Sequence, residues 1–271
     1  MPFDQKKING PDNSFSYKQY IESNKEENQD FELKKGRKDG REPNESRKIA
    51  VQMNAISKAK GSCYIENGNT KLICGVFELR EISRSTRYND KGQLYCDFKY
   101  APFSRDNRKS LNENDEKLIS NSIKTALESV VCLHEFPNYQ IDIFIMVLED
   151  DGSILSTAIM AAGVAFIDAC IPCFDIPASS TIAFYDGKAL VDPTAEEEEI
   201  VNTSNPQNNH GTITLTSLNS IDQVAQILFT GYIEPSILKE AKRQLLENNK
   251  IHEKYLKKVI SMKIVKENRE S

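Results

Sequence analysis

The sequence lacks any long apolar run. No stretch approaches the roughly 18–20 consecutive apolar residues that a membrane-spanning helix needs, and the opening residues, MPFDQKKINGPDN, contain no apolar signal core. No internal repeat with a period of roughly 20–50 residues is visible, which excludes solenoid architectures. We therefore expect a soluble protein made in the cytosol, with no membrane partner.

Groupings of metal-binding or redox residues are also scarce. The three histidines, His134, His210 and His252, are isolated from one another. Cys170 and Cys173 have the spacing of a redox pair or of half a zinc site, but no second pair accompanies them. The interpretation we favour is a chain with no metal site and no cofactor. The cysteines are scattered through apolar runs, which favours reduced, buried thiols over disulfides; they are Cys63, Cys74, Cys96, Cys132, Cys170 and Cys173.

An acidic run, Glu196 to Glu199, offers the other candidate metal cluster when it is taken with Asp192. A run of four glutamates is more often a solvated face. In addition, Thr194 and Glu197 have the spacing of a capping box, which predicts the start of a helical turn. We favour the capping box over the metal site.

Positive charge is concentrated in one segment, although the chain as a whole has a net charge of −5. Residues 80–109 contain eight Lys or Arg residues against four acidic ones. Arg105, Arg108 and Lys109 are closely spaced after Pro102, in a predicted loop. Such a cluster binds phosphate groups without sequence preference. The alternative is scattered surface charge that only keeps the chain soluble.

The order of predicted elements indicates an α+β protein. Residues 1–46 are polar and poor in periodic apolar positions, which predicts a flexible N-terminal arm, and residues 47–271 form one domain. Two strands within residues 61–81 turn at Asn67-Gly68, and a third ends at Pro102. The order β-β-β-α-β-α-β-β-β-β-α, with a long last helix over residues 235–264, predicts helices packed on a mixed β-sheet.

The stretch LEDDGSILSTAIMAAGVAFIDAC, residues 148–170, combines a strand, a glycine turn and a helix that is apolar nearly all round. The start of a helix is a natural anion site, because its free N–H groups and the positive end of its dipole converge there. The sequence therefore raises the question of whether a phosphate binds at Gly152 and Ser153.

Five segments, taken in order, resemble the RNase PH family of phosphorolytic ribonucleases. They are RKDGREPNESR, GSCYIENGNTKLICGVF, LYCDFKYAPFS, PNYQIDIFIMVLEDDGS and DACIPCFD. The resemblance implies the RNase PH-like fold, of the ribosomal protein S5 domain 2-like type. Within the family, the segments LYCDFKYAPF, LEDDGS and LVDPTAEEEE are most similar to a eukaryotic RNA exosome ring subunit, the one called mRNA transport regulator three. A ring subunit of the kind that pairs with an active site is the alternative.

The resemblance also implies where chemistry would occur. Active members carry a Gly-Gly-Thr/Ser-Arg run whose hydroxyl and guanidinium hold the attacking phosphate, and here that run is Asp151-Gly152-Ser153-Ile154. Arginine binds phosphate through two nitrogens and stays charged; isoleucine does neither. The carboxylates of Glu149, Asp150 and Asp151 are expected to cap the helix N–H groups themselves. The aspartate of active relatives is missing from residues 209–215. The expectation is a degenerate phosphate site at Gly152, Ser153 and Ile154, and no catalytic residue.

The resemblance implies an inert subunit of the exosome, which degrades and processes RNA from the 3′ end. Its partners would be other RNase PH-like subunits in a hetero-hexameric ring, cap subunits with S1 or KH folds, and single-stranded RNA, in the nucleus, nucleolus and cytoplasm. The RNA contacts we predict are Arg105, Arg108 and Lys109 first, then Arg80 and Arg84.

Two alternatives stay open. One is an active phosphorolytic exoribonuclease, in which Ser153 binds phosphate and Asp192 replaces the missing acid. The other is a free-standing homohexamer.

Overall fold

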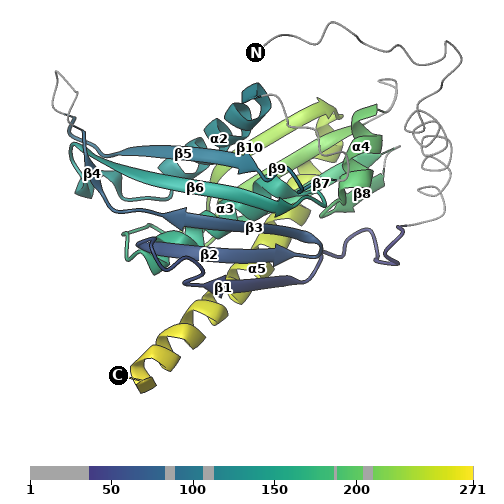
Figure 1. Cartoon of the computed structure of the whole chain (residues 1–271). Coiled ribbons are helices and arrows are strands. Elements are labelled where there is room, and N and C mark those ends of the chain that lie inside the picture. The colour runs from purple at the N-terminus through teal and green to yellow at the C-terminus, as the bar shows by residue number, and fades with distance from the viewer. Residues whose placement is uncertain (1–36, 83–88, 106–112, 186–187, 204–209, 271) are drawn as a thin grey trace, which may run out of the picture. The chain divides into compact units, whose positions relative to one another are not determined.

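The computed structural model describes residues 37–82, 89–105, 113–185, 188–203 and 210–270. The chain divides into two units, residues 1–42 and residues 43–271. In the first unit, Arg41 and Asp39 form an ion pair with 3.0 Å between nitrogen and oxygen. Most of the predicted arm, residues 1–36, lies outside the described ranges, so its flexibility stays a prediction. The elements below all belong to the second unit (Figure 1).

The strands of the first half form a mixed sheet. They lie in the order β1-β2-β3-β6, and β4 and β5 both pair with β6. β5 runs parallel to β6, whereas the other pairs are antiparallel. Gly68 (φ 60°) turns the β2–β3 hairpin, which confirms the predicted turn. The bounds are β1 (Ile49–Met53), β2 (Gly61–Asn67), β3 (Thr70–Val76), β4 (Arg80–Glu81), β5 (Gln93–Tyr100) and β6 (Tyr139–Glu149).

The later strands form a second, antiparallel sheet with the order β10-β9-β7-β8. Its strands are β7 (Ala178–Tyr185), β8 (Lys188–Val191), β9 (His210–Leu218) and β10 (Gln223–Tyr232). The single mixed sheet expected from the sequence is therefore two sheets. The physical reason is the helix α3 (Ile154–Asp168), which packs against β2 and β3 and also against β7.

α3 is buried on all sides because its residues are small and apolar. Twelve of its fifteen residues are buried, as the all-round apolar pattern predicts. Gly61 on β2 allows this close packing, since a Cβ there would lie 2.2 Å from the backbone nitrogen of Ala169. Removing apolar side chains from water on both faces of one helix thus joins the two sheets.

The other helices cover the outer surfaces of this core. α2 (Glu113–Glu128) packs on β5, while α5 (Pro235–Glu270) packs on β7 and β9. Leu245 of α5 lies in a second apolar cluster with Ile213 and Leu215 of β9. A short 3₁₀ helix, η1 (Leu133–Glu135), precedes β6, and α4 (Ala195–Thr203) follows β8. None of the described helices is long and apolar enough to cross a membrane.

Several local expectations need correction. The sequence pattern missed β1, the two-residue β4 and the full extent of α4, and it ended α5 six residues early. Four cysteines are buried as predicted, but Cys170 is exposed and Cys173 is partly exposed. From the sequence we also expect the helix before β6 to begin at a cap, Asn112 or Asn114; Asn114 lies inside α2, and Asn112 falls outside the described residues. β1 has five residues and β4 has two, so each offers too few positions for a two-residue period to identify it.

Candidate functional site

The loop between β6 and α3, residues 150–153, lies at the end of β6 that is close to α4 (Figure 1). Gly152 (φ 80°) and Ser153 (φ 52°) both adopt the left-handed conformation. A Cβ on Gly152 would lie 2.6 Å from the carbonyl oxygen of Pro193, too close for carbon and oxygen. Glycine therefore allows the loop to pack against the segment that precedes α4.

A carboxylate already occupies the start of α3. The N–H of Ser153 donates to Glu198 Oε1 at 2.8 Å, and the Ser153 hydroxyl donates to the carbonyl oxygen of Pro193 at 3.1 Å. Ser153 is only 2% exposed. The two groups of Ser153 that could hold a phosphate, the N–H and the hydroxyl, are thus both used within the protein.

Glu198 holds its proton unusually well. Burial raises the pKa of its carboxyl, the Ser153 N–H lowers it, and nearby Asp150 raises it again, so that the pKa reaches about 7. At neutral pH the site therefore contains an internal oxygen ligand that is charged in part of the molecules. An incoming phosphate would have to displace this ligand and would meet the negative charge of Asp150.

Arg47 is a buried cation beside the same loop. Its Nε and one terminal nitrogen lie 2.9 and 2.7 Å from the two carboxylate oxygens of Asp192, and its other terminal nitrogen donates to the carbonyl oxygen of Asp151 at 2.6 Å. Burial alone would raise the pKa of Asp192, but the hydrogen bonds from Arg47 lower it to about 2. Asp192 is therefore ionised at neutral pH and has no proton to give.

A second arginine, Arg105, also reaches the loop. Its Nε donates to the carboxylate of Asp150, and its guanidinium carbon lies 4.5 Å from the centre of the Tyr100 ring. Ile154, which follows Ser153, is 8% exposed and belongs to the main apolar core. The arginines that contact the loop are therefore neutralised by aspartates, and the residue after Ser153 contributes to packing rather than to charge.

Comparison with known protein families identifies this architecture. Residues 45–172 match the model for domain 1 of the RNase PH-type 3′ exoribonuclease family, and residues 175–262 match the model for domain 2. The chain belongs to the RNase PH family. The boundary between the two matched regions falls at Cys173 and Phe174, between α3 and β7, where the chain passes from the first sheet to the second.

Two curated relatives resemble this RNase PH-type chain over most of its length. It is 30% identical to human exosome complex component MTR3 over 247 residues, which cover 85% of this chain and 84% of that protein. It is 32% identical to Arabidopsis thaliana exosome complex component RRP41-like over 219 residues, covering 80% and 81%. Among solved structures, the Archaeoglobus fulgidus exosome with RNA bound to the active site matches with a TM-score of 0.73. At 21% identity, covering 87% of this chain and 99% of that one, this match shows the RNase PH-like fold.

That this loop is a degenerate phosphate site stays a prediction, but the group that caps the start of α3 differs from the expected one. Gly152, Ser153 and Ile154 lie together as the sequence implies. Asp150 accepts from the N–H of Gly152 at 3.2 Å, while Glu149 faces away and pairs with Lys71 on β3 at 2.7 Å. The group that caps Ser153 is Glu198. It belongs to the acidic run that was interpreted as a solvated face, and that interpretation is wrong for Glu198 and also for Glu197, which is 6% exposed.

The capping box proposed for the same run is confirmed. The N–H of Thr194 donates to Glu197 Oε2 at 3.0 Å, and the N–H of Glu197 donates to Thr194 Oγ1 at 3.4 Å. This reciprocal pair fixes the first turn of α4. Because Glu198 is the next residue, the box also sets the direction in which Glu198 points toward α3.

The two predicted RNA-contacting residues that the structure describes, Arg80 and Arg105, lie apart from each other. Arg80 lies on β4 opposite Gln140 and forms an ion pair of 3.1 Å with Asp142. Arg105 contacts Asp150, beyond the other end of β6. Asp150 is ten residue steps along the chain from Gln140, or about 33 Å in an extended strand. Arg84, Arg108 and Lys109 lie outside the described residues, so their roles stay predictions.

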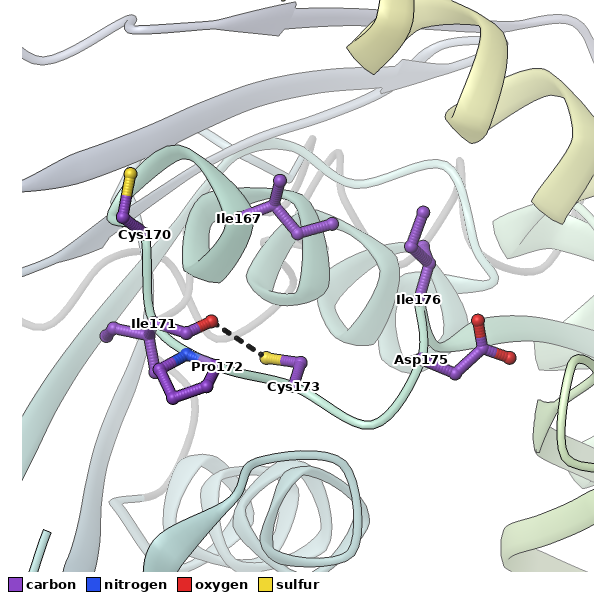
Figure 2. A pocket seen from close by; sticks show the side chains of 7 residues that line it. All are labelled: Ile167, Cys170, Ile171, Pro172, Cys173, Asp175 and Ile176. Carbon is purple, nitrogen blue, oxygen red and sulfur yellow. Dashed lines mark hydrogen bonds between the residues drawn. The ribbon is translucent and has the colours of Figure 1, made fainter. Parts of the chain in front are cut away.

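The Cys170–Cys173 segment lines a hollow at the opposite end of α3 (Figure 2). The Cys173 thiol donates to the carbonyl oxygen of Ile171 at 3.4 Å, and Figure 2 shows the Cys170 thiol on a separate side of the loop. Burial, together with the nearby Cys132, raises the pKa of Cys173 to about 12. A neutral thiol is a poor nucleophile and metal ligand. In the described ranges, no three His, Cys, Asp or Glu side chains gather as a metal site would require.

Sequence reasoning missed two contributors to the site. Arg47 was noticed only as part of a matching segment, and Thr70 was not singled out. The Thr70 hydroxyl donates to the carbonyl oxygen of Gly152 at 2.8 Å and accepts from the N–H of Asp151 at 3.2 Å. Both residues lie far from the loop in sequence, so no local spacing could have connected them to it.

Proposed function

We propose that this chain is a catalytically inert ring subunit of an RNA exosome. Its relatives MTR3 and RRP41-like are named exosome components, and the archaeal structures that share its fold are exosome assemblies. In this role the chain closes a ring of RNase PH-type subunits, supports cap subunits with RNA-binding folds, and borders the path of single-stranded RNA. The degradation itself occurs on other subunits.

The observation that carries this proposal is the hydrogen bond from Ser153 N–H to Glu198. By the family resemblance, this is the position where active members hold the attacking phosphate, and here Glu198 Oε1 accepts from the N–H instead. Phosphorolysis needs positive charge at that position to stabilise the charge that develops in the transition state. Here the nearby guanidinium groups are bound to Asp192 and Asp150, and position 154 is apolar.

The rival reading, an active phosphorolytic enzyme, requires Asp192 to act as the acid. A general acid must be protonated near the working pH. The pKa of Asp192 is held at about 2, and both its oxygens accept from Arg47. Asp192 therefore serves as an anchor for Arg47, which supports the inert assignment.

The activity test uses the chain alone and in its assembly. With labelled single-stranded RNA, phosphate and Mg²⁺, the isolated chain is expected to release no nucleoside diphosphate. In an assembly with RNase PH-type partners, Ser153→Ala is expected to leave the release rate unchanged, because Ser153 holds no phosphate. Ser122→Ala on α2 is the matched hydroxyl control. Release that falls at least about tenfold with Ser153→Ala, but not with Ser122→Ala, contradicts the proposal.

β10 is the edge that we propose for contact with a neighbouring ring subunit. It pairs with β9 on one side and contains no charged residue and no proline. Ile213 and Leu215 of β9 are 1% exposed, but Phe229 and Ile227, their register partners on β10, are 41% and 49% exposed. The apolar side chains that are buried on β9 thus continue onto β10, where they are exposed to solvent. Unguarded apolar edges of this kind are normally covered in the native assembly.

Charges placed on this edge are expected to block assembly. Ile227→Lys combined with Phe229→Lys should reduce the RNase PH-type companions that co-purify with the tagged chain by at least about tenfold, because burying lysines at an interface costs several kcal/mol. Quantitative mass spectrometry of the companions measures this. Gln52→Lys, on the exposed edge strand β1, is the control and should change little. Equal recovery from the β10 variant and wild type would exclude this edge as the contact.

A homohexamer of the isolated chain, seen by light scattering, would instead support the free-standing alternative.

RNA contact is proposed at two separate places. The side chain of Arg80 is 65% exposed at one end of β6. Arg105 at the other end is held by Asp150 and stacked on Tyr100, so it presents a fixed rather than a free cation. Two arginines spaced in this way can contact phosphate groups along an extended single-stranded RNA without sequence preference.

A further inference from the structure

The outward face of the second half of α5 carries an apolar seam. We define the seam by its members, Ile251, Tyr255, Lys258, Met262 and Val265. They follow the alternating four-and-three spacing of a heptad repeat, and at 3.6 residues per turn they fall on a stripe about 80° wide. The four apolar members are 61%, 37%, 55% and 50% exposed, in that order.

This seam is not needed to hold α5 in place. Leu245, Leu256 and Ile260, on nearly the opposite side of the helix, are at most 7% exposed and pack into the protein. Lys263 also bonds to Asp168 at the end of α3. Figure 1 shows the end of α5, in yellow, continuing past β1. The helix is therefore anchored by one face and presents the seam on another.

The charge around the seam is mainly positive. Between residues 247 and 266 there are six lysines and two glutamates. Glu247 is exposed one turn before Ile251, at the start of the seam, whereas Glu253 is 8% exposed and bonds to Lys257 on the side of the helix toward the core. Lys250 and Lys254 lie along one border of the seam and Lys266 along the other, and all three are exposed. The outward face of α5 is thus apolar along its centre and positive at its borders.

We propose that the α5 seam binds an amphipathic helix of a partner protein, one whose apolar stripe is bordered by Glu or Asp. Heptad spacing is the pattern by which one helix packs along another, and acidic borders complement the lysines. The seam spans fourteen residue steps, or about 21 Å, which is two heptads. This inference goes beyond ring membership and does not depend on the proposed function.

Other occupants fit the seam less well. A second copy would bring two positive borders together, and like charges facing each other at an interface are unfavourable. RNA would meet the lysines but would leave the four apolar side chains in water. A membrane surface favours a broad apolar face with lysines only on the polar side, whereas Lys258 lies within the stripe.

A designed peptide provides the test. The probe is a fluorescein-labelled helix of three heptads with Leu at positions a and d and Glu at e and g. Fluorescence anisotropy with the full chain is expected to show saturable binding, and the affinity should fall as the salt concentration is raised. Ile251→Ser with Val265→Ser should weaken binding at least about tenfold, since it removes apolar contacts and keeps every charge. Leu118→Ser, which changes another exposed apolar residue on α2, should have no effect.

A charge exchange gives the sharper arm. The double variant Lys254→Glu with Lys258→Glu should no longer bind the peptide with Glu at e and g. It should instead bind the same peptide with Lys at those positions. Lys239→Glu, the control, should change the affinity for neither peptide. The proposal is overturned by absence of saturable binding, by unchanged binding in the Ser variant, or by failure of the exchange. Binding of polyuridine RNA or anionic vesicles that needs the lysines but not Ile251 and Val265, without peptide binding, would also overturn it. Circular dichroism confirms that each variant is folded.

Discussion

Asp192→Ala is expected to lower the free energy of unfolding by about 3–5 kcal/mol, because it leaves Arg47 buried without its partner carboxylate. Asp192 is 4% exposed and Arg47 is 8% exposed. Their ion pair joins the segment before β1 to the end of β8, and Arg47 also bonds to the carbonyl oxygens of Asp151 and Gly152. The variant should therefore loosen the loop between β6 and α3 as well as the two segments. Urea denaturation at pH 7 measures the change.

The exposed ion pair between Lys71 and Glu149 supplies the matched control. Its atoms lie 2.7 Å apart, as close as those of the buried pair, but both side chains are well exposed. Glu149→Ala should therefore cost no more than about 1 kcal/mol. The double variant Arg47→Ala with Asp192→Ala should cost less than the sum of the single variants, because the unpaired charge is gone. If Asp192→Ala and Glu149→Ala lowered the free energy of unfolding by the same amount, burial of the Arg47–Asp192 pair would make no difference to its contribution to stability.

The same pair gives a pH dependence of known sign. The pKa of Asp192 in the folded protein, about 2, lies below its ordinary value of 3.8. Its contribution to stability is therefore present above about pH 4 and is lost as the pH falls toward 2. Wild type should lose more stability than Asp192→Ala over this interval, since the variant has already lost the contribution.

Glu198→Gln is expected to raise the free energy of unfolding at pH 8 by about 1–3 kcal/mol and to leave it nearly unchanged at pH 5. The pKa of Glu198 in the folded protein, about 7, lies above its ordinary value of 4.5. The stabilising contribution of the protonated carboxyl is thus complete below about pH 4.5 and is lost as the pH rises through 7. Glutamine has no charge to lose, and its amide oxygen still accepts from the N–H of Ser153.

Chemical denaturation at the two pH values, for wild type and variant, measures this difference. Glu199→Gln is the control: its side chain is the next along α4 but is exposed, so its substitution should change stability by less than about 0.5 kcal/mol at either pH. A gain from Glu198→Gln of the same size at pH 5 and pH 8 would mean that charge burial is not its cause. A loss at pH 8 would mean that the carboxylate, rather than the neutral carboxyl, suits the start of α3.

The sequence was most informative where side-chain patterns are local. The strand over β6, the turn at Gly152 and the apolar helix α3 all follow from contiguous residues, because backbone conformation and burial repeat with a short period. The replacement of arginine by Ile154 was also visible directly. The two-sheet arrangement was not, because strand order depends on which faces of α3 are covered.

For the predicted degenerate phosphate site, too, one part could be read from the sequence and another could not. Its missing cation was decided by the identity of one residue, Ile154, and could be read from the chain alone. What fills the site was decided by folding: Glu198 lies 45 residues after Ser153, and Asp192 lies 145 residues after Arg47. Such contacts leave no periodic trace in the sequence, because they depend on where α4 and β8 pack against the loop. The sequence therefore determined that the position after Ser153 has no cation, and only the tertiary structure decided that the Glu198 carboxyl binds the N–H of Ser153.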